Sequence, residues 1–342
     1  MTRNALRQLE AQTGTDVPAE ALEFIRAFDG PVALHQAGTD RSRVRVVVTL
    51  LHGNEPSGVR AVHRWLRSAR TPTTDVVFLL GAIEAALTEP AFTHRTRIAG
   101  PDLNRCFAGS SAGDEGVLAR SLLGIVETIR PEALVDIHNN SGHNPAYGVA
   151  PQIGPAEQRL TSLFATKLVH YDLHIGSMIE LVAQRRPAVV VEVGRAGDPA
   201  ADQAAWRGLE QFLTREAVID GSDPTPSLDL LVAPVRVKAA VDLVAYSTRP
   251  EPGAELTIAE DIDRHNFESL PAGTVFGWVD AGRPLPLEAY GADGRDRAHD
   301  LFVVRHGRLE TRETIVPIMM TTDPRIALGD CLFYVVRPAG RT

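Results

Sequence analysis

The amino-acid sequence predicts an α/β fold followed by a smaller β-rich domain. Up to about residue 220, short apolar runs alternate with segments of helical periodicity, which indicates a mixed, mostly parallel sheet flanked by helices. The segment 220–227 is rich in Asp, Ser, Pro and Gly and is the best candidate for a linker. Beyond it, short β-rich runs are separated by turn signals. We therefore expect an α/β domain over residues 1–222 and a carboxyl-terminal β domain over residues 223–342.

The elements of the first domain follow from apolar runs and helical spacing. After a helical lead-in to about residue 30, the segment 31–34 is expected to be an edge strand. Apolar runs predict buried strands at 44–51, 76–80, 133–138 and 189–193. Helical spacing predicts helices directly after the first of these strands and at 114–130, 155–168 and 198–218. In the β domain, strands are expected at 228–235, 241–246, 274–279, 301–305, 314–320 and 331–337.

The composition is that of an ordinary globular protein and argues against some function classes. Of 342 residues, 44% are hydrophobic and 23% charged, and the formal net charge is −8. Lys and Arg form no stripe that favours nucleic acid, no apolar run is long enough for a membrane span, and the amino terminus lacks a signal-peptide core. Two cysteines, Cys106 and Cys331, are too few for a disulfide framework. We expect a cytoplasmic protein. The sequence leaves the oligomeric state open, and a homo-oligomer is one of the alternatives.

A His and a Glu stand three residues apart in the loop after the first buried strand, in His52-Gly53-Asn54-Glu55. This loop lies at the carboxyl end of a central strand, where open α/β sheets bind their ligands. Gly53 allows the loop to turn tightly. An imidazole and a carboxylate this close can reach one metal ion, and two His with one Glu form a known catalytic zinc set. The motif therefore predicts a metal site if a second His lies nearby.

The second His ends another apolar strand, in Asp136-Ile137-His138. Neighbouring parallel strands would bring His52, Glu55 and His138 together at one edge of the sheet. Each residue alone is most simply an ordinary polar residue at a strand end. The set of three, each at the end of an apolar strand, favours the metal site instead.

A further carboxylate and a long irregular loop are also candidates for the site. Glu192 lies inside the apolar run 189–193, and burying a carboxylate is unfavourable unless it has a partner. Either a salt bridge satisfies this carboxylate, or the residue faces outward on an edge strand, or the carboxylate points into a site that tunes its pKa. The stretch 88–113 has no periodicity, and a loop of this length in a compact domain is usually functional or disordered.

Four stretches, in this order, resemble the succinylglutamate desuccinylase/aspartoacylase family, zinc amidohydrolases related to the zinc carboxypeptidases. They are His52-Gly53-Asn54-Glu55, Asp102-Leu103-Asn104-Arg105, Asp136-Ile137-His138 and Val191-Glu192-Val193-Gly194. The resemblance covers residues from about 44 to 197, and the last third of the chain fits more loosely the β domain that these enzymes carry. It implies a zinc-carboxypeptidase-like form of the predicted sheet.

The resemblance implies a metal centre and a general base. His52, Glu55 and His138 would hold one zinc ion per chain. Glu192 would take a proton from the attacking water and pass it to the leaving amine. Asp102 would orient a metal ligand rather than contact the substrate.

The resemblance also implies how the substrate is held. Arg97, eight residues before Arg105, would steady the oxyanion, and Asn104 and Arg105 would bind a substrate carboxylate, which the fork of an arginine matches. Two guanidiniums near one zinc ion in a chain of net charge −8 favour a small anionic substrate. The alternative is that both arginines pair with acidic residues and fix the loop.

The sequence departs from the family pattern in places. Aspartoacylases carry another substrate-binding arginine about ten residues before the catalytic Glu, whereas here Arg185 and Arg186 lie nearer the strand. His143 is an additional imidazole, expected in the pocket or on the surface. Tyr290 and Tyr334 are both candidates for the tyrosine that the family draws from its β domain.

The sequence as a whole predicts a zinc-dependent hydrolase that cleaves the amide bond of a small N-acyl amino acid or a related carboxylate. The same metal site could cleave a carboxyl-terminal peptide bond, so a carboxypeptidase-like activity is the nearest alternative. A non-catalytic binding protein on the same fold is the other. Metal content and turnover of N-acyl amino acids separate these three readings.

Overall fold

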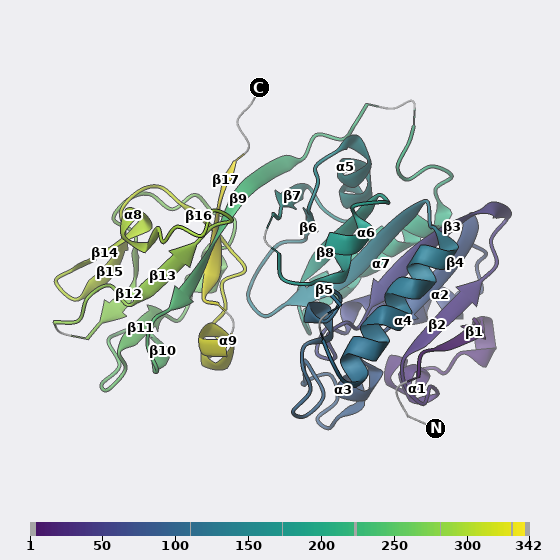
Figure 1. Cartoon of the computed structure of the whole chain (residues 1–342), viewed down its shortest axis with the longest axis horizontal. Coiled ribbons are helices and arrows are strands. Elements are labelled where there is room, and N and C mark those ends of the chain that lie inside the picture. The colour runs from purple at the N-terminus through teal and green to yellow at the C-terminus, as the bar shows by residue number, and fades with distance from the viewer. Residues whose placement is uncertain are drawn as a thin grey trace. The chain divides into compact units, whose positions relative to one another are not determined.

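The computed structural model describes residues 5–109, 111–172, 174–221, 224–280, 282–329 and 331–338 (Figure 1). The chain divides into two compact units. Unit 1 comprises residues 1–139, 146–169 and 174–229, and unit 2 comprises residues 140–145, 170–173 and 230–342. The predicted domain boundary lies between Ser222 and Asp223, which fall outside the described residues, so that boundary stays a prediction. The sequence did not indicate that two short segments of its first half group with unit 2.

Unit 1 contains the mixed, mostly parallel sheet that the sequence predicts. Its strands follow the order β1-β2-β4-β3-β5-β8-β6-β7. The pairs β1–β2, β3–β4 and β3–β5 are parallel, whereas β2–β4 and β6–β8 are antiparallel. The strands are β1 (Arg7–Glu10), β2 (Val32–Gln36), β3 (Asp40–Thr49), β4 (Thr74–Leu80), β5 (Ala133–Asn140), β6 (Tyr147–Ala150), β7 (Lys167–His170) and β8 (Ala188–Arg195).

Helices cover both faces of this sheet because successive side chains of a strand point to opposite sides. On one face, Val46 and Val48 of β3 share a core cluster with Leu118 and Leu122 of α4 (Asp114–Ile129). On the other face, α2 (Ser57–Arg67) packs over β3 and β5 and against α7 (Pro199–Thr214). Shorter helices are α1 (Ala21–Arg26), α3 (Ile83–Leu87), α5 (Pro155–Ser162) and α6 (Met178–Val182), with short 3-10 turns at Gly14–Asp16 and Leu103–Arg105.

Several predicted elements were wrong in detail. The helical lead-in contains a strand, β1, which pairs with β2, so β2 is not an edge strand. The predicted helix at 155–168 ends at Ser162 and gives way to β7, and α7 ends at Thr214 rather than 218. Strand β1 is short and largely polar, so its pairing with β2, and not its own pattern, makes it a strand. None of the described helices is long and apolar enough to cross a membrane.

Unit 2 consists of β-strands around its own core. One group places β9 (Asp229–Ala239) between β13 (Leu287–Tyr290) and β17 (Phe333–Pro338), with β16 (Val316–Ile318) beyond β17. The other is a five-stranded sheet, β10-β11-β12-β15-β14. Phe276, Phe302 and Phe333 from the two groups meet in the core, with ring centroids 5.2 to 5.9 Å apart.

The six strands predicted for the last third of the chain are present among the strands of unit 2. The five-stranded sheet is built from β10 (Val244–Ser247), β11 (Leu256–Ala259), β12 (Val275–Val279), β15 (Arg308–Thr311) and β14 (Phe302–Arg305). The sequence missed β11, β13 and β15. It also missed a 3-10 turn and two short helices, at Ile262–His265, α8 (Ala298–Leu301) and α9 (Pro324–Gly329).

Candidate metal centre

Two glycines, one in the loop after β3 and one in the first turn of α2, allow this part of the chain to pack closely against its surroundings. A Cβ on Gly53 would lie 2.5 Å from the backbone nitrogen of Ala86 in α3, and a Cβ on Gly58 would lie 2.2 Å from Oγ1 of Thr49. Real Cβ atoms do not approach other heavy atoms that closely, so both positions require glycine. The loop therefore turns directly above the end of β3, and helix α2 starts against the sheet.

The pairing of β3 with β5 brings the predicted ligands together. The two strands are parallel and adjacent, with Thr49 opposite Ile137, so His52 and His138 follow at the same edge of the sheet. The two imidazole rings have centroids 5.1 Å apart at an interplanar angle of 66°. The prediction that neighbouring parallel strands unite these residues is confirmed.

The carboxylate of Glu55 bridges the two histidines. His52 Nδ1 lies 2.8 Å from Glu55 Oε1, and His138 Nδ1 lies 2.7 Å from Glu55 Oε2. The backbone N–H of Asn139 also donates to Oε2, at 3.2 Å. One ligand atom from each of His52, Glu55 and His138 lies within 4.8 Å of the others, and all three residues are buried.

Two further carboxylates lie beside the opposite nitrogens of the same rings. His52 Nε2 lies 3.0 Å from Asp102 Oδ1, and His138 Nε2 lies 3.0 Å from Asp136 Oδ2. Metal-binding histidines commonly donate their other ring nitrogen to a carboxylate, which fixes the orientation of the ring. The Asp102 contact is the one that the sequence led us to expect. The contact of Asp136 was missed, although its place two residues before His138 on one strand puts both side chains on the same face.

The charged and hydrogen-bonding partners within the cluster shift the pKa values of Glu55, Asp102 and His138 more than burial does. Burial raises the pKa of the Glu55 carboxyl, but the imidazoles of His52 and His138 and their hydrogen bonds hold that pKa below its usual range. Burial likewise raises the pKa of Asp102, and the contacts with His52 and nearby arginines lower it below normal. The pKa of His138 is lowered by burial, but Asp136 and Glu55 raise it well above its ordinary value.

This donor set fits a single metal ion. The buried carboxylates of Glu55 and Asp136 and the partly buried carboxylate of Asp102 surround two imidazoles, so the cluster favours positive charge at its centre. Two histidines and one glutamate form a zinc set that leaves a coordination position open. Within the part of the chain that the structure describes, this is the group of residues that could hold a metal ion.

Asn139 connects the cluster to the surrounding elements. Its Oδ1 accepts from the backbone N–H of Ser57 at 3.0 Å, and its Nδ2 donates to Ser57 Oγ at 2.9 Å and to the carbonyl of Gly194 at 3.0 Å. Ser57 Oγ in turn donates to Asp202 of α7 at 2.6 Å. No pattern in the sequence indicates this role beyond the position of Asn139 next to His138.

Glu192 lies in β8, the strand next to β5. Leu134 N donates to the carbonyl of Pro187, and Asn139 Nδ2 donates to the carbonyl of Gly194. Later residues of β5 therefore contact later residues of β8, so the two strands run in the same direction. At this register Glu192 lies near the level of His138. Its side chain is buried, which argues against the outward-facing edge position that was one of the alternatives for this residue.

The motif from Asp102 to Arg105 forms a short 3-10 turn beside the cluster. Asp102 caps this turn by accepting from the backbone N–H of Asn104 at 2.8 Å. Oδ1 of Asn104 accepts from Met178 N at the start of α6, at 3.2 Å, so part of its hydrogen-bonding capacity serves the fold. Nη1 of Arg105 donates to the carbonyl of Asn104 at 3.1 Å.

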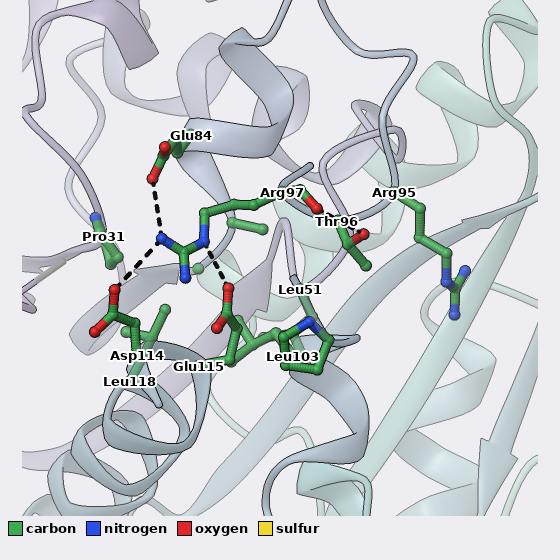
Figure 2. Close-up of a pocket in the computed structure, with 13 residues that line it drawn as sticks. Pro31, Leu51, Glu84, Arg95, Thr96, Arg97, Leu103, Asp114, Glu115 and Leu118 are labelled. Carbon is green, nitrogen blue, oxygen red and sulfur yellow. Dashed lines mark hydrogen bonds and ion pairs between the residues drawn. The ribbon is translucent and has the colours of Figure 1, made fainter. Parts of the chain in front are cut away.

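Arg97 lies among carboxylates (Figure 2). Its Nε donates to Glu115 at 2.5 Å, and its Nη1 lies 3.6 Å from Glu84 and 3.5 Å from Asp114. Figure 2 shows this guanidinium pointing toward the three acidic side chains, while Arg95 extends in another direction. These contacts fit the alternative in which Arg97 fixes the loop, and its predicted role at the oxyanion stays a prediction.

Arg95, to which the sequence assigned no role, contacts the cluster. Its Nε and Nη2 donate to Asp102 Oδ2 at 3.1 and 2.9 Å, and its Nη1 lies 3.4 Å from Glu55 Oε1. Nothing in a single sequence distinguishes two arginines two residues apart in an irregular loop, so this assignment required the structure.

The other candidate residues have ordinary surroundings. Arg185 is exposed and pairs with Glu127 of α4 at 3.2 Å. His143 was expected either in the pocket or on the surface, and its exposure agrees with the surface location. Tyr290 is partly exposed, whereas Tyr334 is buried in unit 2 with its ring 6.2 Å from that of Tyr171, and the choice between the two tyrosines stays open.

Solved structures share the fold. A succinylglutamate desuccinylase/aspartoacylase from Rhodobacter sphaeroides is 18% identical, with a TM-score of 0.59 over 91% of this chain and 88% of that one. A succinylglutamate desuccinylase from Vibrio parahaemolyticus is 13% identical, with a TM-score of 0.60 over 94% and 96%. The ectoine utilization protein EutE (DoeB) from Ruegeria pomeroyi is 15% identical, with a TM-score of 0.55 over 89% and 87%. No curated protein matches the sequence.

The family comparison rests on sequence rather than on fold. Residues 44–207 match the succinylglutamate desuccinylase/aspartoacylase catalytic domain. This segment includes His52, Glu55, His138 and Glu192 and the turn that begins at Asp102. It also agrees closely with the range over which the four motifs resemble the family. Residues 44–207 therefore belong to the succinylglutamate desuccinylase/aspartoacylase catalytic-domain family.

Proposed function

We propose that the chain is a zinc-dependent hydrolase that cleaves the amide bond of a small N-acyl amino acid or a related carboxylate. The observation that carries the proposal is the Glu55 carboxylate, which faces the Nδ1 atoms of both His52 and His138 while their Nε2 atoms face carboxylates. The relatives named succinylglutamate desuccinylase and aspartoacylase support an amide as the bond cleaved.

A zinc ion held by His52, Glu55 and His138 would polarise the acyl carbonyl and make the attacking water more acidic. The remaining chemistry belongs to side chains. Glu192 accepts a proton from the water as the water oxygen bonds to the acyl carbon. When the carbon–nitrogen bond breaks, Glu192 gives this proton to the leaving amine. The products are a carboxylic acid and an amine.

Substrate binding falls to the turn that begins at Asp102. Arg105 and Asn104 lie one turn beyond the carboxylate that orients His52, so a substrate carboxylate bound there would place the scissile amide toward the cluster. The role of Arg97 at the oxyanion stays a prediction, because its guanidinium would have to leave Glu115 to reach a reacting carbonyl.

A hydrolysis screen tests the proposal. The zinc-loaded protein is offered N-succinyl, N-acetyl and N-formyl amino acids, together with short peptides that carry a free carboxyl terminus. Turnover of at least one N-acyl amino acid, abolished by a chelator and by His138→Ala, is the expected result. Turnover of peptides alone would favour the carboxypeptidase-like alternative. Zinc binding without turnover of any compound would favour the binding protein.

A further inference from the structure

Arg95 brings a guanidinium to the carboxylates of the metal centre. Its Nε and Nη2 donate to Asp102 Oδ2 at 3.1 and 2.9 Å, and its Nη1 lies 3.4 Å from Glu55 Oε1. Its backbone carbonyl accepts from the N–H of Gly53 at 2.9 Å, which anchors the residue beside the loop of metal ligands. The positively charged guanidinium of Arg95 therefore lies beside the same carboxylates that would attract a metal ion.

We propose that Arg95 is a positioning residue that weakens metal binding: it neutralises Glu55 and Asp102 in the metal-free protein and competes with the metal for Glu55. This inference rests on the proposed function in that it assumes a divalent cation at His52, Glu55 and His138.

The competition follows from the chemistry of the donors around Glu55. Oε1 of Glu55 is approached by His52 Nδ1 at 2.8 Å and by Arg95 Nη1 at 3.4 Å. An imidazole can release its proton when a metal arrives, whereas a guanidinium cannot be deprotonated in a protein. The incoming cation must therefore displace Arg95 from Glu55 or bind next to its positive charge. The side chain of Arg95 is 41% exposed, so it can turn toward water.

The sign of the effect depends on whether Asp102 needs Arg95, and the contacts indicate that it does not. Oδ1 of Asp102 accepts from the backbone N–H of Asn104 at 2.8 Å and lies 3.0 Å from His52 Nε2. Arg95 contacts the other oxygen, Oδ2. Removing the guanidinium should leave Asp102 oriented toward His52 and make the cluster more negative, and a more negative cluster binds a cation more tightly.

Arg97 provides a matched control two residues away in the same loop. Its ion pairs go to Glu115, Glu84 and Asp114. Neutralising Arg97 removes the same charge from the same loop without removing a contact to Glu55 or Asp102. Any general effect of loop charge or loop stability should therefore appear in both variants.

Zinc affinity measured by competition with a chromophoric chelator tests the inference without any substrate. The neutral variants Arg95→Gln and Arg95→Ala should bind zinc more tightly than the unaltered protein, on the order of tenfold, which is a moderate electrostatic effect at a partly exposed site. Arg95→Lys, which keeps the charge, should stay nearer the unaltered protein, and Arg97→Gln should change the affinity less than about twofold.

The outcomes separate this inference from the proposed function. Equal or weaker zinc binding in both neutral Arg95 variants would overturn the inference and leave the proposed hydrolase standing. The same tightening in Arg97→Gln would overturn it as well, because the effect would then not come from the contact with Glu55. Failure of the unaltered protein to bind zinc would overturn the proposed function, and the inference with it.

Discussion

At the scale of single residues, Glu55 decides how the metal centre is organised. It lies between two imidazoles, each of which has a second carboxylate behind it. Removing either imidazole should empty the site, because one His and one Glu are too few ligands for a tight zinc site. We expect about one zinc per chain in the unaltered protein and far less in His52→Ala and in His138→Ala, measured by metal analysis after dialysis. Full occupancy in both variants would contradict the assignment of these ligands.

The buried carboxylate of Glu192 is the residue proposed to move the proton. Glu192→Gln keeps the shape of the side chain but cannot accept a proton, so the variant should bind zinc normally. Its turnover should fall by at least about a hundredfold, the usual scale for loss of a general base. Steady-state kinetics and metal analysis of the same preparation check both statements. Near-normal turnover would remove Glu192 from the mechanism.

Arg97 and Arg105 should respond differently to substitution. Arg105→Ala should mainly raise KM, because a bound carboxylate is held in both the ground state and the transition state. Arg97→Ala leaves Glu115 without its partner, so we expect it to lose about 1–3 kcal/mol of stability. If Arg97 also contacts the oxyanion, Arg97→Ala should lower kcat and leave KM unchanged.

Thermal unfolding and full kinetics of both variants separate these roles. A fall in the melting temperature of Arg97→Ala with normal kcat supports the loop-fixing role. A fall in the kcat of Arg97→Ala, with or without a lower melting temperature, supports the oxyanion role that the family resemblance implies.

At the scale of elements, the start of helix α2 is fixed by its contact with the sheet. A Cβ on Gly58 would lie 2.2 Å from Oγ1 and 2.9 Å from Cβ of Thr49 in β3. Gly58→Ala should therefore push α2 away from the sheet and destabilise the protein by about 1–3 kcal/mol, as overpacking does. Chemical denaturation measures the change. A neutral or stabilising effect would show that the helix can move without cost.

The control for this substitution lies in another helix of unit 1. Gly124 is in α4, and a Cβ there would meet no heavy atom within 4 Å. Gly124→Ala should stabilise the protein by about 0.5–1 kcal/mol, because alanine loses less backbone freedom in a helix than glycine does. The two substitutions make the same chemical change, so their difference isolates the packing of α2 on β3.

At the scale of the whole molecule, the proposed metal ligands all belong to unit 1. A ligand that binds only the folded state stabilises that state by about 2.7 kcal/mol at a hundred times its dissociation constant. Removing the metal should therefore accelerate hydrogen exchange chiefly in α2, β3 and β5, which carry or support the ligands. Exchange in the strands of unit 2, such as β12 and β15, should change little. Comparison of chelated and zinc-loaded protein by mass spectrometry measures this, and equal changes in both units would contradict it.

The amino-acid sequence was sufficient to predict the α/β class, the β-rich last third, the loop motifs and the set of His52, Glu55 and His138. These follow from local pattern, because apolar runs mark buried strands and polar residues at their ends mark a ligand-binding edge. The strand β1, the end of the helix at Ser162 and the packing of Gly58 depended on pairing and contact with distant segments. Such contacts leave no periodic signal in the chain.

Only the folded chain shows which groups surround the proposed metal ligands. Asp136 faces His138 because both side chains point to one side of β5, and Asp102 reaches His52 from a loop fifty residues later in the chain. Arg95 and Arg97 are chemically identical and two residues apart, yet one contacts Glu55 and the other three carboxylates around Glu115. The physical reason is that electrostatic partners are chosen by distance in space, and the irregular loop that carries both arginines has no repeating geometry from which that distance can be inferred.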